Sequence, residues 1–237
     1  MRHSRRLLLG GPIVLVVLAG VWTAWQVWSW PDVAALATDE PRTTAYIERW
    51  RRSQRASGKP DRVERIRVPY DTVSDHLKRA ILVAEDINFF SHNGFDTGEM
   101  REAVKEAMTE GRRPRGASTI TQQLARNLWL SPSRNPVRKV KEALLTRQLE
   151  RALSKRRILE LYLNVVEFGP GVYGAEAASR HYFGRRARRL SRKQAARLAA
   201  ALPSPDTLNP HRIPADHWRV RLVRERMAKA DFLHRLI

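Results

Sequence analysis

The feature that most constrains this chain is an uncharged apolar segment near its N-terminus. Residues 7–30 (LLLGGPIVLVVLAGVWTAWQVWSW) hold 24 positions without a charge and follow the basic residues 1–6 (MRHSRR). A helix needs about 20 apolar residues to cross a bilayer, and interfacial tryptophans cluster at the outer end of this segment. The sequence therefore predicts a transmembrane helix at 7–30, with 1–6 in the cytoplasm and everything after Pro31 outside it. A cleaved signal peptide is the alternative, but the segment is long and shows no small-x-small cleavage site.

The charge balance restricts the class of partner. The chain carries 44 basic and 24 acidic residues, a formal net charge of +20. Such a field favours nucleic acid, an anionic membrane or a phosphorylated substrate, although an arginine-rich solvated surface is a simpler explanation for part of it. The predicted location outside the cytoplasm argues against nucleic acid. The absence of cysteine excludes disulfides, thiolate chemistry and cysteine metal sites.

Helical patterns dominate the rest of the chain. Residues 31–62 are polar and predict a juxtamembrane stalk or linker, and residues 63–237 predict one mainly α domain. Two capping boxes, Thr119-x-x-Gln122 and Ser191-x-x-Gln194, each predict a helix start. Apolar periodicity predicts helices at 74–90, 137–153, 157–168, 172–182 and 218–236, and a strand at 63–68.

The first candidate site is AEDINFFSHNG. On an ideal helix Glu85 lies about 40° from Ile81, on the shoulder of the apolar arc, whereas Asp86 lies about 140° away from Ile81. Phe89, four residues on, shares the side of Glu85. Lost solvation at the edge of a core raises a carboxyl pKa, as a general acid or base requires. The alternative is a surface glutamate paired with a nearby cation, and His92 fits a turn.

Two further stretches carry groups that suit an anion. In RGASTITQQLARN, Gly116 and Ser118 precede a helix whose free N–H groups attract anions, and Gln123 and Arg126 add donors. The alternative is an ordinary helix cap. Residues 133–157 hold nine basic residues and two acids. Lys141 falls in the middle of an apolar arc, beside Glu142, which is costly unless an anion is near or the lysine reaches out to solvent. Together these features indicate chemistry at a sugar–phosphate bond, without deciding whether that bond is made or cut.

At these stretches the chain resembles the family 51 glycosyltransferases, the peptidoglycan polymerases. The resemblance covers roughly Val68 to Pro210, with AEDINFFSHNG, GASTITQQLARN, RKVKEALL and KRRILELYLNVVEFGPGVYGAEAASRHYF in the family's order. The combination of E-D-x-x-F-x-x-H-x-G with TITQQL is highly specific. The chain has no Ser-x-x-Lys, the nucleophile motif of a penicillin-binding transpeptidase, so it resembles the monofunctional members.

The resemblance implies a lysozyme-like, two-lobed domain that joins lipid II units into β-1,4 glycan and releases undecaprenyl pyrophosphate. It assigns Glu85 as the general base and places Glu142 near the leaving pyrophosphate. It assigns Asp86, Ser118, Gln123, Arg126, Arg134 and Lys141 to substrate binding. A divalent cation, Mg²⁺, would neutralise pyrophosphate charge. The expected location is the bacterial inner membrane, with the domain periplasmic. The expected partners are lipid II, the growing strand, the membrane and proteins of cell-wall synthesis or division.

Two other functions compete with this one. A lytic enzyme acting on finished glycan would share the fold and a single glutamate, but it needs no pyrophosphate-binding cations. A non-catalytic basic membrane scaffold would tolerate the loss of Glu85. Residues 95–115, which contact the membrane in the family, are rather polar here.

Overall fold

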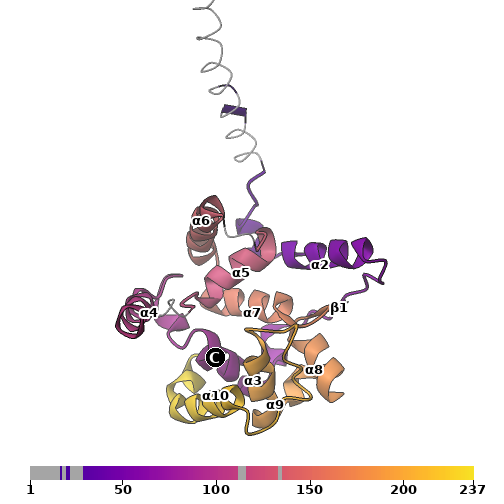
Figure 1. Cartoon of the computed structure of the whole chain (residues 1–237), viewed down its shortest axis with the longest axis vertical. Helices are drawn as coiled ribbons and strands as arrows, with labels where there is room; N and C mark the ends of the chain where they lie inside the picture. The colour runs from indigo at the N-terminus through magenta and orange to yellow at the C-terminus, as the bar shows by residue number, and fades with distance from the viewer. Residues whose placement is uncertain (1–16, 18–19, 22–28, 112–115, 133–134) are drawn as a thin grey trace, which may run out of the picture. The chain divides into compact units, whose positions relative to one another are not determined.

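The computed structural model describes residues 17, 20–21, 29–111, 116–132 and 135–237 (Figure 1). The chain divides into two units, Met1–Asp32 and Val33–Ile237. Most of the predicted transmembrane segment, 7–30, lies outside the described residues. Among the residues that are described, none of the helices combines the length and apolar character that crossing a bilayer requires.

The second unit begins earlier than the sequence predicted. A 3-10 helix, η1 (Ala34–Ala37), and a helix, α2 (Ala45–Ala56), occupy much of the predicted stalk at 31–62. Arg157 fastens this segment, because its Nε donates to the Leu36 carbonyl at 2.9 Å and its Nη1 donates to Glu40 Oε1 at 2.7 Å. Ile47 of α2 is buried. Residues from Val33 on are therefore part of the folded unit, and the predicted boundary at residue 63 is too late.

The centre of the unit is α3 (Asp75–Glu85), which packs against α9 (Arg192–Ala201) and α10 (Trp218–Lys229) (Figure 1). Its N-cap is Ser74, whose side chain accepts from the His76 N–H. The predicted helix at 74–90 is wrong at its end. Asp86 leaves the helix with φ −166° and ψ 78°, and a 3-10 helix, η3 (Phe89–Ser91), follows.

A second group of helices packs beside this core. The helix α5 (Ile120–Trp129) contacts both α6 (Pro136–Ala152) and α7 (Lys155–Val165). Both predicted capping boxes are confirmed, at Thr119 before α5 and at Ser191 before α9. Ser154 caps α7 where the sequence predicted a break between helices. The mainly α class is confirmed.

A small sheet replaces parts of the predicted helices. Its strand order is β1 (Glu64–Arg65), β3 (Val172–Tyr173), β2 (Glu167–Gly169), with β1 parallel and β2 antiparallel to β3. The predicted helix at 172–182 begins only after Gly174, whose φ of +84° suits a glycine, so that α8 spans Ala175–Phe183. The predicted strand at 63–68 is confirmed over two residues, because Val68 pairs instead with the side chain of Asn164.

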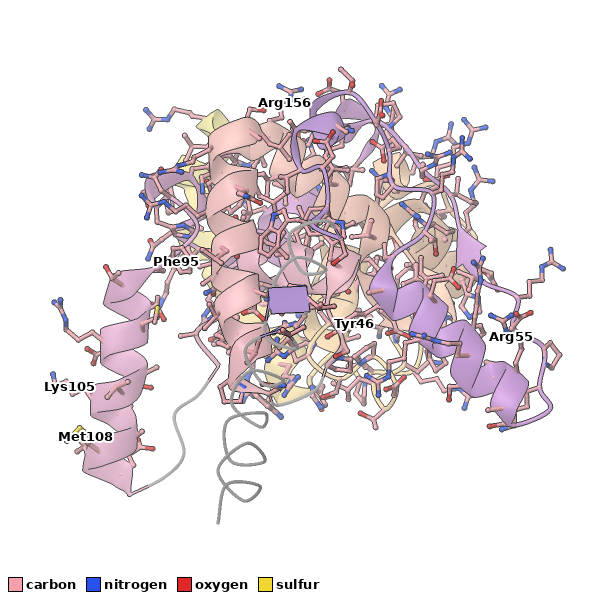
Figure 2. All side chains as sticks on the ribbon, turned by 90° about the horizontal axis from the view of Figure 1, so that it is seen from above. Tyr46, Arg55, Phe95, Lys105, Met108 and Arg156 are labelled. Carbon is pink, nitrogen blue, oxygen red and sulfur yellow. The ribbon has the colours of Figure 1, made fainter. Side chains whose placement is uncertain are left out.

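The remaining differences are at helix ends and in α4. The prediction at 157–168 runs past the end of α7 into β2, and that at 218–236 covers α10 and then a 3-10 helix, η5 (Asp231–Arg235). The helix α4 (Thr97–Glu110) was not predicted; it lies at the edge of the unit in Figure 1. Only Ala103 of α4 is buried, and Lys105 and Met108 project from it in Figure 2.

Candidate active site

One cavity brings several predicted residues together. It has a volume of about 900 Å³, near the upper end of the range for ligand sites. Four predicted site residues line it: Glu85, Ser118, Gln123 and Arg126. The end of α3 supplies the first, and α5 with the segment before it supplies the others. Their convergence means that the two motifs form one site.

Glu85 is the acid at the cavity wall. Burial raises its pKa above the ordinary value, while a hydrogen bond from Gln123 and the positive charges of Arg126 and Arg219 act in the opposite direction. The raised pKa that the sequence predicts is confirmed, but its neighbour is not Phe89. The ring of Phe89 packs against Phe90 at 5.1 Å between centroids. The spacing argument failed because the helix ends at Glu85 and the next turn does not exist.

A short hydrogen-bond relay orients Glu85. The Tyr162 hydroxyl donates to Gln123 Oε1 at 3.0 Å, and Gln123 Nε2 donates to Glu85 Oε2 at 2.8 Å. Tyr162 is buried, and its donated bond fixes which side of the Gln123 amide faces the carboxylate. Within the described part of the chain, Glu85 Oε1 makes no hydrogen bond, which leaves that oxygen for a ligand in the cavity.

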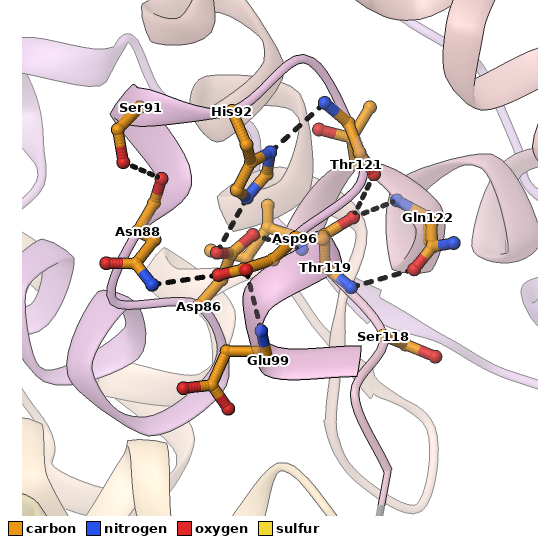
Figure 3. A network of polar contacts seen from close by, with 12 residues as sticks. Asp86, Asn88, Ser91, His92, Asp96, Glu99, Ser118, Thr119, Thr121 and Gln122 are labelled. Carbon is orange, nitrogen blue, oxygen red and sulfur yellow. Dashed lines mark hydrogen bonds and ion pairs between the residues drawn. The ribbon is translucent and has the colours of Figure 1, made fainter. Parts of the chain in front are cut away.

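Asp86 does a different job from its neighbour. Its Oδ2 accepts from the Ile120 N–H at 2.9 Å, and its Oδ1 lies 2.9 Å from His92 Nε2 (Figure 3). His92 Nδ1 accepts from the Gly94 N–H at 3.1 Å, so the ring proton is on Nε2 and points at Asp86. Asp86 is only 7% exposed. We call these three contacts the Asp86 bridge, which joins the end of α3 to the start of α5.

The bridge changes the meaning of two sequence predictions. The helical wheel placed Asp86 away from the core, whereas it is buried because the chain turns inward after Glu85. The start of α5 was predicted to attract an anion, and the anion there is Asp86 itself, on the Ile120 N–H. The Gln122 N–H is also taken, by Thr119 Oγ1. These contacts favour a positioning role for Asp86 over substrate binding.

Glu142 and the lysine beside it do not line this cavity among the described residues. Glu142 is 0% exposed and pairs with Arg138 and Lys139. The predicted apolar arc around Lys141 is wrong, because Val140 and Leu144 are exposed and the buried face of α6 runs through Glu142 instead. Lys141 is half-buried. Arg134, also predicted to bind substrate, lies outside the described residues.

Several residues of the site escaped sequence reasoning. Arg219 of α10 contributes a charge near Glu85, and nothing in the spacing of the motifs connects α10 to α3. One face of α2 and the end of β2 also line the cavity, through Trp50 and Glu167 among others. The signal for α2 was present, because Tyr46, Arg49, Trp50, Ser53 and Gln54 follow helical spacing.

The predicted divalent cation finds no suitable cage in the described part of the chain. Asp86, His92 and Asp96 each offer a ligand atom within 4.8 Å of the others. However, Asp86 is committed to the bridge, and Asp96 accepts from the Glu99 N–H and from Asn88 Nδ2 (Figure 3). Mg²⁺ prefers octahedral oxygen ligands and keeps several waters. This cluster therefore does not fit Mg²⁺.

A helical domain that holds a desolvated, oriented glutamate beside arginines in a large cavity defines an acid–base enzyme. Comparison with known families specifies which one. The sequence model of the transglycosylase family matches residues 52–228. The chain therefore belongs to the transglycosylase family, and the predicted class of enzyme, a glycosyltransferase, is confirmed.

Individual relatives agree with this assignment. A biosynthetic peptidoglycan transglycosylase of Azoarcus sp. (strain BH72) is 50% identical over 182 residues, which cover 76% of this chain and 78% of the relative. The protein of the same name from Paraburkholderia xenovorans is 42% identical over 98% of this chain and 99% of the relative. A third, from Thiobacillus denitrificans, is 45% identical over 84% of each.

Proposed function

We propose that this protein is a peptidoglycan glycosyltransferase that polymerises lipid II into β-1,4-linked glycan strands and releases undecaprenyl pyrophosphate. Membership of the transglycosylase family supports the reaction class, and the names of the relatives support peptidoglycan as the product. The observation that carries the proposal is Glu85, whose carboxylate stands at the wall of a 900 Å³ cavity with one oxygen held by Gln123.

The proposed reaction is a single displacement. The 4-hydroxyl of the acceptor sugar attacks the anomeric carbon of the growing strand, while Glu85 Oε1 takes the hydroxyl proton. The bond from the anomeric carbon to the diphosphate breaks, and the diphosphate leaves with its electron pair. Attack from the opposite face turns the α-linkage into a β-linkage. A positioned base contributes about 10²–10⁴-fold to such a step.

Cations stabilise the departing diphosphate in this proposal. Arg126 lines the cavity beside Glu85, and Arg138 and Lys139 are held in place by the buried carboxylate of Glu142. Glu142 thus acts by positioning cations. Lys141 and Arg134 keep their predicted role in diphosphate binding. Because the Asp86 cluster does not fit Mg²⁺, we propose that Mg²⁺ comes with the diphosphate and not with a protein cage.

Exposed apolar side chains support a location at the membrane. The helix α4 presents Met100, Val104 and Met108, spaced four residues apart along one side, and Met108 is 80% exposed. The start of α6 presents Val137 and Val140 as well. Contiguous exposed apolar groups are typical of membrane or partner contact. We propose that the domain, with the predicted two lobes, works at the outer face of the bacterial inner membrane, anchored by residues 7–30.

Purified full-length protein with labelled lipid II in detergent or liposomes tests the proposal. We expect polymeric glycan and free undecaprenyl pyrophosphate, both lost in Glu85→Gln. A parallel incubation with finished glycan strands distinguishes a lytic enzyme. Glycan cleavage without polymer formation, or full activity of Glu85→Gln in recruiting wall enzymes, would overturn the proposal in favour of the hydrolase or the scaffold.

A further inference from the structure

The cavity has a second polar region, built by α2 and the β2–β3 hairpin. One helical face of α2 lines it through Tyr46 and Trp50; Figure 2 shows Tyr46 near the start of α2. Trp50 is seated on Gly171, since a Cβ added there would lie 2.7 Å from Trp50 Cζ2. Gly171 has φ +75°. The wall is therefore fixed by close packing between α2 and the hairpin.

Across from α2, two strand residues present polar groups to the cavity. Glu167 and Tyr173 are cross-strand partners, and partners in register share a face of the sheet. Tyr173 is 0% exposed, yet its hydroxyl makes no hydrogen bond. It lies near the Glu167 carboxyl group without reaching hydrogen-bonding geometry. A buried hydroxyl without a partner is unfavourable, so one in a cavity wall indicates a ligand that supplies the missing bond.

The charges around Glu167 are mixed. Burial raises the pKa of Glu167 to about 7, and the nearby Asp206 carboxylate adds to this effect. Tyr173, the Gly171 backbone and the positive charge of Arg49 lower the pKa. Asp206 and Arg49 also line the cavity. The region thus offers a hydroxyl, two carboxyl groups and a guanidinium around one space, with aromatic rings beside them.

We propose that Glu167, Tyr173 and Asp206 form a second carbohydrate subsite, which binds the hydroxyl and acetamido groups of a hexosamine unit away from the reacting centre. Sugar hydroxyls and acetamido N–H groups donate to the carboxylates. The Tyr173 hydroxyl donates to a sugar oxygen or an acetamido carbonyl, and the α2 rings pack on the apolar face of the sugar. The proposal rests on the proposed function, because it takes the substrate of the cavity to be glycan.

Binding of a β-1,4-linked N-acetylglucosamine tetrasaccharide, measured by calorimetry on the full chain, tests this subsite. We expect Tyr173→Phe to weaken binding about 2- to 10-fold, as for one neutral hydrogen bond. Glu167→Gln should weaken it about 10-fold and remove the pH dependence of binding near pH 7. Tyr70→Phe is the matched control, because the Tyr70 hydroxyl is also buried and unpartnered but does not line the cavity.

The outcomes separate this inference from the proposed function. Unchanged tetrasaccharide affinity in both Tyr173→Phe and Glu167→Gln, with wild-type thermal stability, would overturn the subsite even if lipid II is still polymerised. Equal losses in Tyr173→Phe and Tyr70→Phe would also overturn it. Selective loss in the two cavity variants supports the subsite, including in a protein that binds glycan without polymerising lipid II, in which case the proposed function alone fails.

Discussion

Replacing Asp86 by asparagine separates the Asp86 bridge from a substrate-binding role. Asparagine keeps the shape but can accept only one of the two hydrogen bonds, from the Ile120 N–H and from His92 Nε2, each now at 2.9 Å. Its NH₂ group then meets the other donor. A change of His92 tautomer does not help, because Nδ1 already accepts from the Gly94 N–H.

The size of the effect follows from those contacts. A hydrogen bond to a charged group contributes about 1.5–3 kcal/mol, and a facing donor pair adds to its loss, so Asp86→Asn should cost about 2–4 kcal/mol. For a domain of this size that corresponds to a fall in Tm of roughly 5–15 °C. Thermal unfolding by circular dichroism measures it. Asp71→Asn is the control, since Asp71 pairs with Arg156 at the surface, with 77% of its side chain exposed.

Activity completes the test. If the bridge positions Glu85 against α5, Asp86→Asn should lower kcat together with Tm. A double-mutant cycle with His92→Ala should show coupling of about 1–3 kcal/mol, as expected for groups in direct contact. A Tm shift no larger than that of Asp71→Asn, combined with a raised KM for lipid II, would refute the bridge and restore Asp86 as a substrate ligand.

Three further changes test other parts of the structure. Arg126→Gln should move the acidic limb of the pH–rate profile to higher pH, because Arg126 lowers the pKa of Glu85 and the base must be ionised; an unmoved limb would contradict this. Gly171→Ala should cost at least about 2 kcal/mol in urea unfolding, from a positive φ and a clash, whereas Gly58→Ala, with positive φ but open space around it, should cost about 1 kcal/mol. Glu167→Gln should flatten the dependence of stability on pH: folded Glu167 keeps its proton to about pH 7 against a reference value of 4.5, so wild-type stability falls between these values, by up to about 3 kcal/mol, and an unchanged slope would refute the shift.

Local signals in the sequence predicted the starts of helices better than their ends. The two capping boxes and the Ser154 cap are chemical patterns within four residues, and the structure has all three. The end of α3 depends instead on a contact between Asp86 and Ile120, 34 positions apart. No spacing within the segment carries that information. The wheel therefore assigned Glu85 well and Asp86 badly.

The site shows the same division. Glu85, Ser118, Gln123 and Arg126 were found because each lies in a motif, and the structure brings them into one cavity. The cavity-lining face of α2 and Arg219 of α10 were missed because only tertiary packing places them there. Lys141 misled the analysis, since an apolar arc on a helix shows which face is apolar and not whether another element covers it.

The central claim is that Glu85 is the general base of a lipid II polymerase, and one measurement tests it most directly. Initial rates of lipid II polymerisation are compared for wild type, Glu85→Gln and Glu64→Gln, an exposed glutamate paired with His181. We predict a loss of at least about 10²-fold in Glu85→Gln alone, with unchanged Tm and unchanged affinity for a diphosphate donor mimic. A Glu85→Gln rate close to that of wild type would contradict the assignment.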